Sequence, residues 1–149
     1  MPPRSELMAS WQLWAALASL FAALTAVLAK LGVAAIPSNL ATFLRTLVVA
    51  AVLAALLLAR GELVWSQLAG LERRSLLALG FSGLATGASW LCYFRALQLG
   101  PVARVASIDK FSVVLVALFG VLALGETLTP RAWLGVLLMA GGAVLVALP

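Results

Sequence analysis

Five long apolar stretches, separated by short segments that are polar or contain glycine and proline, dominate the pattern along the chain. A helix needs about 20 mostly apolar residues to cross a hydrocarbon core of about 30 Å. Each stretch is about that long, and no regular apolar–polar alternation predicts strands instead. The predicted membrane-spanning helices are Ser10–Leu31, Asn39–Ala59, Ser75–Leu97, Val102–Leu124 and Pro130–Leu148. The chain is therefore predicted to be an all-α integral membrane protein, a bundle of five transmembrane helices forming one domain over residues 1–149.

The residues between these stretches support the limits of the helices. Ser38 and Asn39 are predicted to cap the second helix, and Gly100 and Pro101 separate the third from the fourth. Thr129 precedes a proline and is predicted to be the N-cap of the fifth helix. Only the 60–74 connection is long, and its apolar residues have roughly helical spacing, which predicts a segment lying along the membrane interface. Those residues are Leu63, Val64, Trp65, Leu68 and Leu71.

Composition agrees with a chain solvated by lipid. Hydrophobic residues make up 64% of the sequence and charged residues only 10%, against about 25% charged in soluble domains. The net charge of +5 comes mostly from single, scattered basic residues, whereas nucleic-acid-binding proteins concentrate theirs on one solvated face. The lone cysteine, Cys92, excludes an intramolecular disulfide. We therefore expect the lipid bilayer, and no nucleic acid, as a partner.

The basic residues are only modestly biased toward one side of the membrane. An odd number of spans places the termini on opposite sides, and the N-terminal side carries five arginines. The other side carries two basic residues in its loops, or four if those slightly inside the helices are counted. The positive-inside rule then places the N-terminus in the cytoplasm, but so weakly that the chain is also suited to insertion in both orientations. Four of the five tryptophans fall on the N-terminal side, which an antiparallel pair of chains would balance.

Charged residues also lie inside the predicted spans, where they are costly and mark functional sites. Asp109 and Lys110 lie about 12 Å into the fourth helix at 1.5 Å per residue, and being adjacent they point about 100° apart. Arg45 lies about 9 Å into the second helix from the same side, and Arg95 lies near that side in the third helix. Lys30 ends the first helix on that side, and Arg104 lies at the start of the fourth helix.

Two interpretations of this cluster remain open. In the structural one, Asp109 pairs with Arg45 or Arg95 and ties helices together, while Lys30 and Arg104 reach the interface. In the functional one, the cluster binds or gates a polar substrate or carries a coupled proton. The candidate substrate-binding or gating residues are Asp109, Lys110, Arg45, Arg95, Trp90 and Ser112.

Small residues indicate where helices pack closely. Gly83 and Gly87 form a G-x-x-x-G pattern in the third helix, which permits close backbone approach. In the fifth helix Gly135, Leu138 and Gly142 share one stripe, which is predicted to pack against another helix of this chain or of a second one. The sequence has no histidine, no phosphate-binding loop and no CxxC pair, so no catalytic residue, metal or cofactor is predicted, and we expect no enzyme.

The last three helices resemble the EamA half-domain of the drug/metabolite transporter superfamily. Tyr93–Gly100 resembles its aromatic-Ala-Leu-x-x-Gly motif, and Leu124-Gly125-Glu126 resembles its Leu-Gly-Glu motif. The glycine stripe of the fifth helix is similar to the dimer-forming last helix of small multidrug resistance proteins in the same superfamily. Those proteins use a glutamate in helix 1, which this chain lacks; the departure argues against multidrug-cation efflux and leaves Asp109 as the only embedded carboxylate.

The resemblance implies one half of an inverted-repeat transporter, because most EamA proteins carry two five-helix halves and this sequence has no internal repeat. A second copy in an antiparallel homodimer, or a paralogous half, would then complete the transporter. We expect a secondary transporter of a small polar metabolite, working by alternating access in the cell membrane, in bacteria the inner membrane. The alternatives are a flippase or accessory subunit for a lipid or polyprenyl phosphate, and a membrane scaffold that transports nothing.

Overall fold

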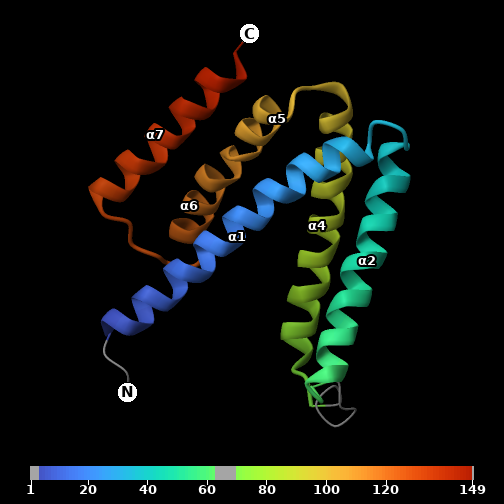
Figure 1. Cartoon of the computed structure of the whole chain (residues 1–149). Helices are drawn as coiled ribbons and strands as arrows, with labels where there is room; N and C mark the ends of the chain where they lie inside the picture. The colour runs from blue at the N-terminus through green and yellow to red at the C-terminus, as the bar shows by residue number, and fades with distance from the viewer. Residues whose placement is uncertain (1–3, 63–69, 149) are drawn as a thin grey trace. The chain divides into compact units, whose positions relative to one another are not determined.

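The computed structural model describes residues 4–62 and 70–148, and within them it contains helices and no strand (Figure 1). The helices are α1 (Arg4–Gly32), α2 (Ser38–Ala59), α4 (Arg73–Leu99), α5 (Val102–Asp109), α6 (Phe111–Ala123) and α7 (Pro130–Ala147). Five of the described segments are long and apolar enough to cross a membrane, with α5 and α6 together forming the fourth. The predicted all-α membrane fold with five spans is confirmed.

The ends of the helices agree with the prediction to within two residues, except that α1 begins at Arg4, earlier than the predicted Ser10. The start of α2 also differs in how it is capped. Ser38 and Asn39 already lie inside α2, because the carbonyl of Pro37 accepts the N–H of Ala41 at 2.9 Å. No side chain caps α2, so the capping role predicted for Ser38 and Asn39 is wrong. The predicted N-cap of α7 is confirmed, since the side chain of Thr129 accepts the N–H of Ala132 at 3.2 Å.

The fourth span is interrupted at Lys110, where the sequence predicted one continuous helix. The N–H of Lys110 bonds the carbonyl of Ser107 at 3.1 Å, and the N–H of Val113 bonds that of Lys110 at 3.0 Å. Both are i→i+3 bonds, which tighten the helix locally and often mark a functional irregularity in mid-helix. One turn earlier, the hydroxyl of Ser107 donates to the carbonyl of Ala103 at 2.8 Å, a bond that often bends helices. The fourth span thus consists of two helices, α5 and α6.

The connection after α2 is described only in part. Gly61 has φ +65°, a left-handed conformation that glycine adopts without steric cost, and it ends the helical path of α2. Of the predicted interfacial segment at 60–74, the part that carries Leu63, Val64, Trp65 and Leu68 lies outside the described residues.

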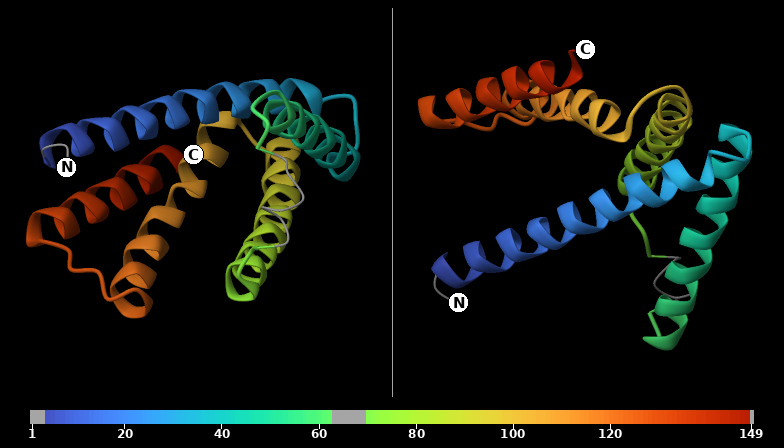
Figure 2. Two further views of the ribbon diagram at one scale, coloured as in Figure 1. Left: turned by 90° about the horizontal axis from the view of Figure 1, so that it is seen from below. Right: turned by 45° about the horizontal axis from the view of Figure 1, so that its top comes forward.

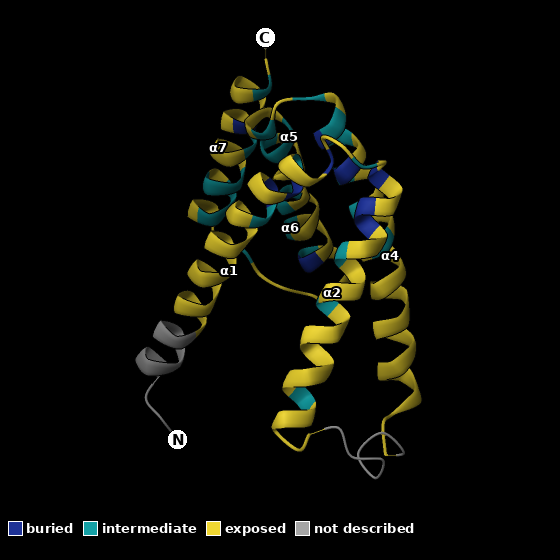
Figure 3. Cartoon of the chain, turned by 45° about the vertical axis from the view of Figure 1, so that its right-hand side comes forward, coloured by how far each residue is buried: buried dark blue, intermediate teal, exposed yellow. Residues whose placement is uncertain are grey.

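The chain divides into two compact units, each described here by itself. One unit spans Gly32–Leu99, and in it α2 contacts α4. The two helices meet where α2 begins and α4 ends and diverge toward their other ends (Figure 2). Its buried residues gather where α2 begins and α4 ends, and Leu97 is fully buried there (Figure 3). The other unit combines residues up to Leu31 with those from Gly100 on, and in it α7 packs on α5 and α6.

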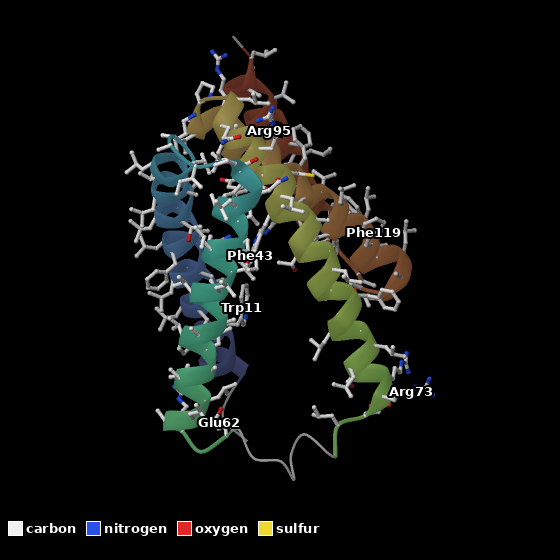
Figure 4. All side chains as sticks on the ribbon, turned by 90° about the vertical axis from the view of Figure 1, so that its right-hand side faces the viewer. Trp11, Phe43, Glu62, Arg73, Arg95 and Phe119 are labelled. Atoms are coloured by element: carbon white, nitrogen blue, oxygen red, sulfur yellow. The ribbon has the colours of Figure 1, made fainter. Side chains whose placement is uncertain are left out.

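Large apolar side chains cover the outside of the spans. Trp11, Phe43 and Phe119 are examples that project from their helices (Figure 4). In each of the five spans, no more than 11% of the most apolar window is buried inside the chain. Such surfaces require lipid or other helices as their surroundings, because a soluble protein rarely exposes large contiguous apolar patches.

Candidate substrate-binding site

Two of the six predicted site residues, Arg45 and Trp90, contact each other in the α2–α4 unit. The guanidinium carbon of Arg45 lies over the ring of Trp90, 4.2 Å from its centroid, and 5.5 Å from the centroid of Phe94. Both distances lie within the range of a cation–π interaction. Trp90 and Phe94 are four residues apart on α4 and therefore present their rings on one face of the helix. Arg45 is thus held between α2 and α4 by aromatic rings.

The hydroxyls nearest to Arg45 along α2 are bonded within the helix. Thr42 donates to the carbonyl of Ser38 and Thr46 to that of Thr42, each at 2.8 Å. This back-bonding satisfies both hydroxyl donors locally in an apolar segment. Neither threonine is hydrogen-bonded to Arg45, whose contacts in this unit are the two rings.

Arg95 belongs to a hydrogen-bonded chain at the end of α4. Its Nη1 donates to Oε1 of Gln98 at 3.0 Å, and Nε2 of Gln98 donates to the carbonyls of Val33 at 3.2 Å and Ile36 at 3.0 Å. Gln98 therefore fastens the turn between α1 and α2 to α4. Arg95 is exposed beside it (Figure 4), and its described contact supports this turn.

Asp109 and Lys110 form an ion pair at the interruption of the fourth span. Oδ2 of Asp109 lies 3.9 Å from Nζ of Lys110, although adjacent residues on a helix point apart. Both side chains are about half-exposed, and Ser112, the second residue of α6, is exposed. A carboxylate, an ammonium group and an irregular turn of the helix therefore coincide within a mostly apolar span.

Lys30, which the sequence placed among the cationic residues of this side, bonds the backbone. Its Nζ donates to the carbonyl of Gly100 at 2.9 Å, so it ties the end of α1 to the start of the α4–α5 connection within one unit. This bond also supplies a partner for a carbonyl just before Pro101. Lys30 therefore has a structural role in addition to its charge.

The glycines predicted to pack closely are open within their own units. A Cβ added at Gly83, Gly87, Gly135 or Gly142 would meet no atom of the same unit within 4 Å. Leu138, on the same stripe of α7, is exposed. The predicted packing through these residues thus stays a prediction about a partner helix.

The sequence analysis missed two residues that build this region, Phe94 and Gln98. Phe94 was signalled by its i+4 spacing from Trp90, and Gln98 by its place in the Tyr93–Gly100 motif. Asp109, Lys110 and Ser112 lie in one unit, whereas Arg45, Trp90 and Arg95 lie in the other. The prediction that the two groups share one site therefore stays a prediction.

These residues stay candidates for binding a polar solute, and they do not form a metal site. Among the described residues, no three His, Cys, Asp or Glu side chains gather as metal ligands would. Charged residues and helix irregularities inside membrane spans are features of the substrate sites of many membrane transporters.

A comparison with protein families decides where these helices belong. The profile of the EamA-like transporter family matches residues 9–148. The chain belongs to the EamA-like transporter family. It is therefore a multi-pass membrane transporter, and its five spans correspond to one half-domain of this family.

One relative is similar over nearly its whole length. It is an uncharacterised transporter from the cobO 3′ region of Sinorhizobium sp, 56% identical over 138 residues. The match covers 93% of this chain and 96% of the relative, so the relative also has the length of a single half-domain. No solved structure matches the chain significantly.

Proposed function

We propose that the chain is one half of a secondary transporter for a small polar metabolite and that it works as an antiparallel homodimer. The observation that carries this proposal is the Asp109–Lys110 ion pair at the interruption of the fourth span. Ionisable residues inside a membrane span are rare unless they serve a substrate or proton pathway. Interrupted helices build the midplane sites of many secondary transporters.

The family supports alternating access between two half-domains that rock around a shared site. A chain with one set of five spans needs a second set, and a second copy inserted in the opposite orientation would supply it. The modest bias in basic residues is compatible with insertion in both orientations. Gly135 and Gly142, open on the surface of α7, allow a second α7 to approach closely.

The charged pair is tested by transport in reconstituted liposomes. Uptake of radiolabelled amino acids and small carboxylic acids is screened first with the unchanged protein. We expect Asp109→Asn and Lys110→Met each to abolish the uptake that this screen identifies. Glu62→Gln is the matched control, because Glu62 lies after α2 and its carboxylate pairs with Arg60 at 3.9 Å outside the apolar spans. Full transport by both Asp109→Asn and Lys110→Met would refute the role of the pair.

The antiparallel dimer is tested by topology reporters fused to the C-terminus. One reporter is active only in the cytoplasm and the other only in the periplasm, since we place the protein in a bacterial inner membrane. Signal from both establishes insertion in both orientations. Signal from one reporter alone would contradict the homodimer and require a paralogous partner of opposite orientation.

The same proteoliposomes distinguish transport of a metabolite from the two alternatives. Translocation of a fluorescent phospholipid, accelerated by the protein while metabolite uptake stays at background, would identify a lipid flippase. Neither activity, with the two reporters both positive, would identify a scaffold. Metabolite uptake that depends on Asp109 excludes both.

A further inference from the structure

We propose that Arg45 is an oxyanion-binding residue and that Trp90 and Phe94 hold its guanidinium ready for a carboxylate or phosphate of the transported solute. The inference rests on the transporter function proposed above and narrows the substrate to a class, anionic or zwitterionic solutes with such a group. It uses only contacts within the α2–α4 unit.

The aromatic rings set the position of the guanidinium. Trp90 lies 4.2 Å and Phe94 5.5 Å from its central carbon, measured to the ring centroids. Phe94 is 3% exposed and packs at the buried end of the unit, so one ring of the pair is immobilised. An arginine held in this way loses little conformational freedom when it binds a ligand, which favours binding.

The same contacts leave the N–H groups of Arg45 without an oxygen partner in the described part of the chain. A guanidinium carries five N–H donors in one plane, and an aromatic face attracts its charge without supplying an oxygen acceptor. Four other cations of the described residues have oxygen partners: Lys30 bonds the carbonyl of Gly100, Arg95 bonds Gln98, Arg60 pairs with Glu62 and Lys110 pairs with Asp109. Arginines without a described oxygen partner also occur in the first turns of α4, α5 and α7, but Arg45 lies about two turns into its span and has only rings as partners.

The depth of Arg45 in its membrane span makes the lack of an oxygen partner costly. Arg45 lies about 10 Å from the start of α2 at 1.5 Å per residue, within a span of high hydropathy. A cation at that depth is costly, and attraction to two rings recovers only part of the cost. A carboxylate or phosphate that accepts two parallel N–H bonds provides both the opposite charge and the missing acceptors.

Binding is tested with Trp90 as the reporter, because its ring contacts the guanidinium. The four other tryptophans are replaced by phenylalanine, and the full chain is purified in a neutral detergent. Succinate and inorganic phosphate are titrated separately at constant ionic strength, with chloride replacing them in the reference. We expect a saturable change of Trp90 emission with at least one of these oxyanions.

The variants separate an anion site from a structural clamp. Arg45→Gln is expected to abolish the response, and Arg45→Lys to weaken the apparent affinity at least tenfold, because an ammonium cannot form the bidentate pair. Arg73→Gln is the control, because it removes the same charge at the start of α4, the end opposite to Trp90 and Phe94 (Figure 4). This variant should bind the oxyanions with the affinity of the parent protein. Circular dichroism and gel filtration establish folding; if Arg45→Gln does not fold, Arg45→Lys decides the question alone.

Three outcomes would overturn the assignment. The first is no saturable response to either oxyanion, and the second is equal affinity in Arg45→Lys and the parent protein. The third is a response only in nanodiscs containing phosphatidylglycerol and none to soluble anions, which would identify a lipid headgroup rather than a transported solute. Because the readout is binding, a protein that binds these anions but transports nothing refutes the transporter proposal and leaves the anion site standing.

Discussion

The hydrogen bonds of Gln98 provide a direct test of what holds the α2–α4 unit together. We consider Gln98→Met, which keeps the length of the side chain and removes all its hydrogen-bonding groups. The variant loses two bonds to backbone carbonyls, at 3.2 Å to Val33 and 3.0 Å to Ile36, and the bond accepted from Arg95. Because no other residue is changed, the loss in the free energy of unfolding measures the contribution of these hydrogen bonds.

The magnitude follows from the surroundings of each bond. The net contribution of a hydrogen bond to the stability of a protein is about 0.5–1.5 kcal/mol, and hydrogen bonds between membrane helices contribute about 0.6 kcal/mol on average. Val33 is buried, so its carbonyl has little access to water once Gln98 is gone, and the cost lies toward the upper end. The exposed bond from Arg95 contributes little. We expect a loss of about 2 kcal/mol, close to a 30-fold change in the unfolding equilibrium.

The assay is reversible unfolding in mixed micelles, in which the fraction of a denaturing detergent is raised and helicity is recorded. Thr86→Val is the matched control on α4, because its hydroxyl donates only to the carbonyl of Ser82 within an exposed part of the same helix. The control should change the free energy of unfolding by less than about 0.5 kcal/mol. The reasoning fails if Gln98→Met is as stable as Thr86→Val.

Three further predictions use the same assay. Leu97→Ala should destabilise the chain by about 2–5 kcal/mol, because Leu97 is 0% exposed and its removal leaves a cavity; a loss below 1 kcal/mol would show that the unit collapses around the site. Gly125→Ala should cost about 1–2 kcal/mol, since its φ of +68° is unfavourable for a residue with a Cβ; an unchanged free energy would mean that the turn adopts another conformation. Thr129→Ala should cost about 1 kcal/mol through the lost N-cap bond to Ala132, whereas Thr129→Ser should keep most of it.

Much of the fold was accessible from local sequence alone. Each span can be recognised from its own length and apolarity, because the bilayer requires both of every helix that crosses it, whatever the other helices are. Thr129 and Pro130 were sufficient to place the start of α7, because capping and proline act within a single turn. The same kind of local signal gave a wrong prediction at Ser38. Ser38 was predicted to precede α2 as a cap, but it is the first residue of the helix, because the carbonyl of Pro37 accepts the first helical hydrogen bond.

The candidate site was accessible only in part. Arg45, Asp109 and Lys110 were recognised because charge is conspicuous inside an apolar span, whatever its partners are. Gln98 was not recognised, since an amide near a helix end carries no such signal. The interruption at Lys110 also went unpredicted, because neither proline nor glycine lies at that position.

The sequence by itself determined five membrane-spanning helices, all their ends except the start of α1, and the charged residues that they carry into the membrane. Only the tertiary structure decided which partners these residues have: Trp90 and Phe94 for Arg45, Gln98 for Arg95, and Lys110 for Asp109. The reason is physical. Crossing a bilayer depends on the composition of one segment, whereas a contact such as that between Arg45 and Trp90 depends on the rotation and register of two helices that are far apart in the chain.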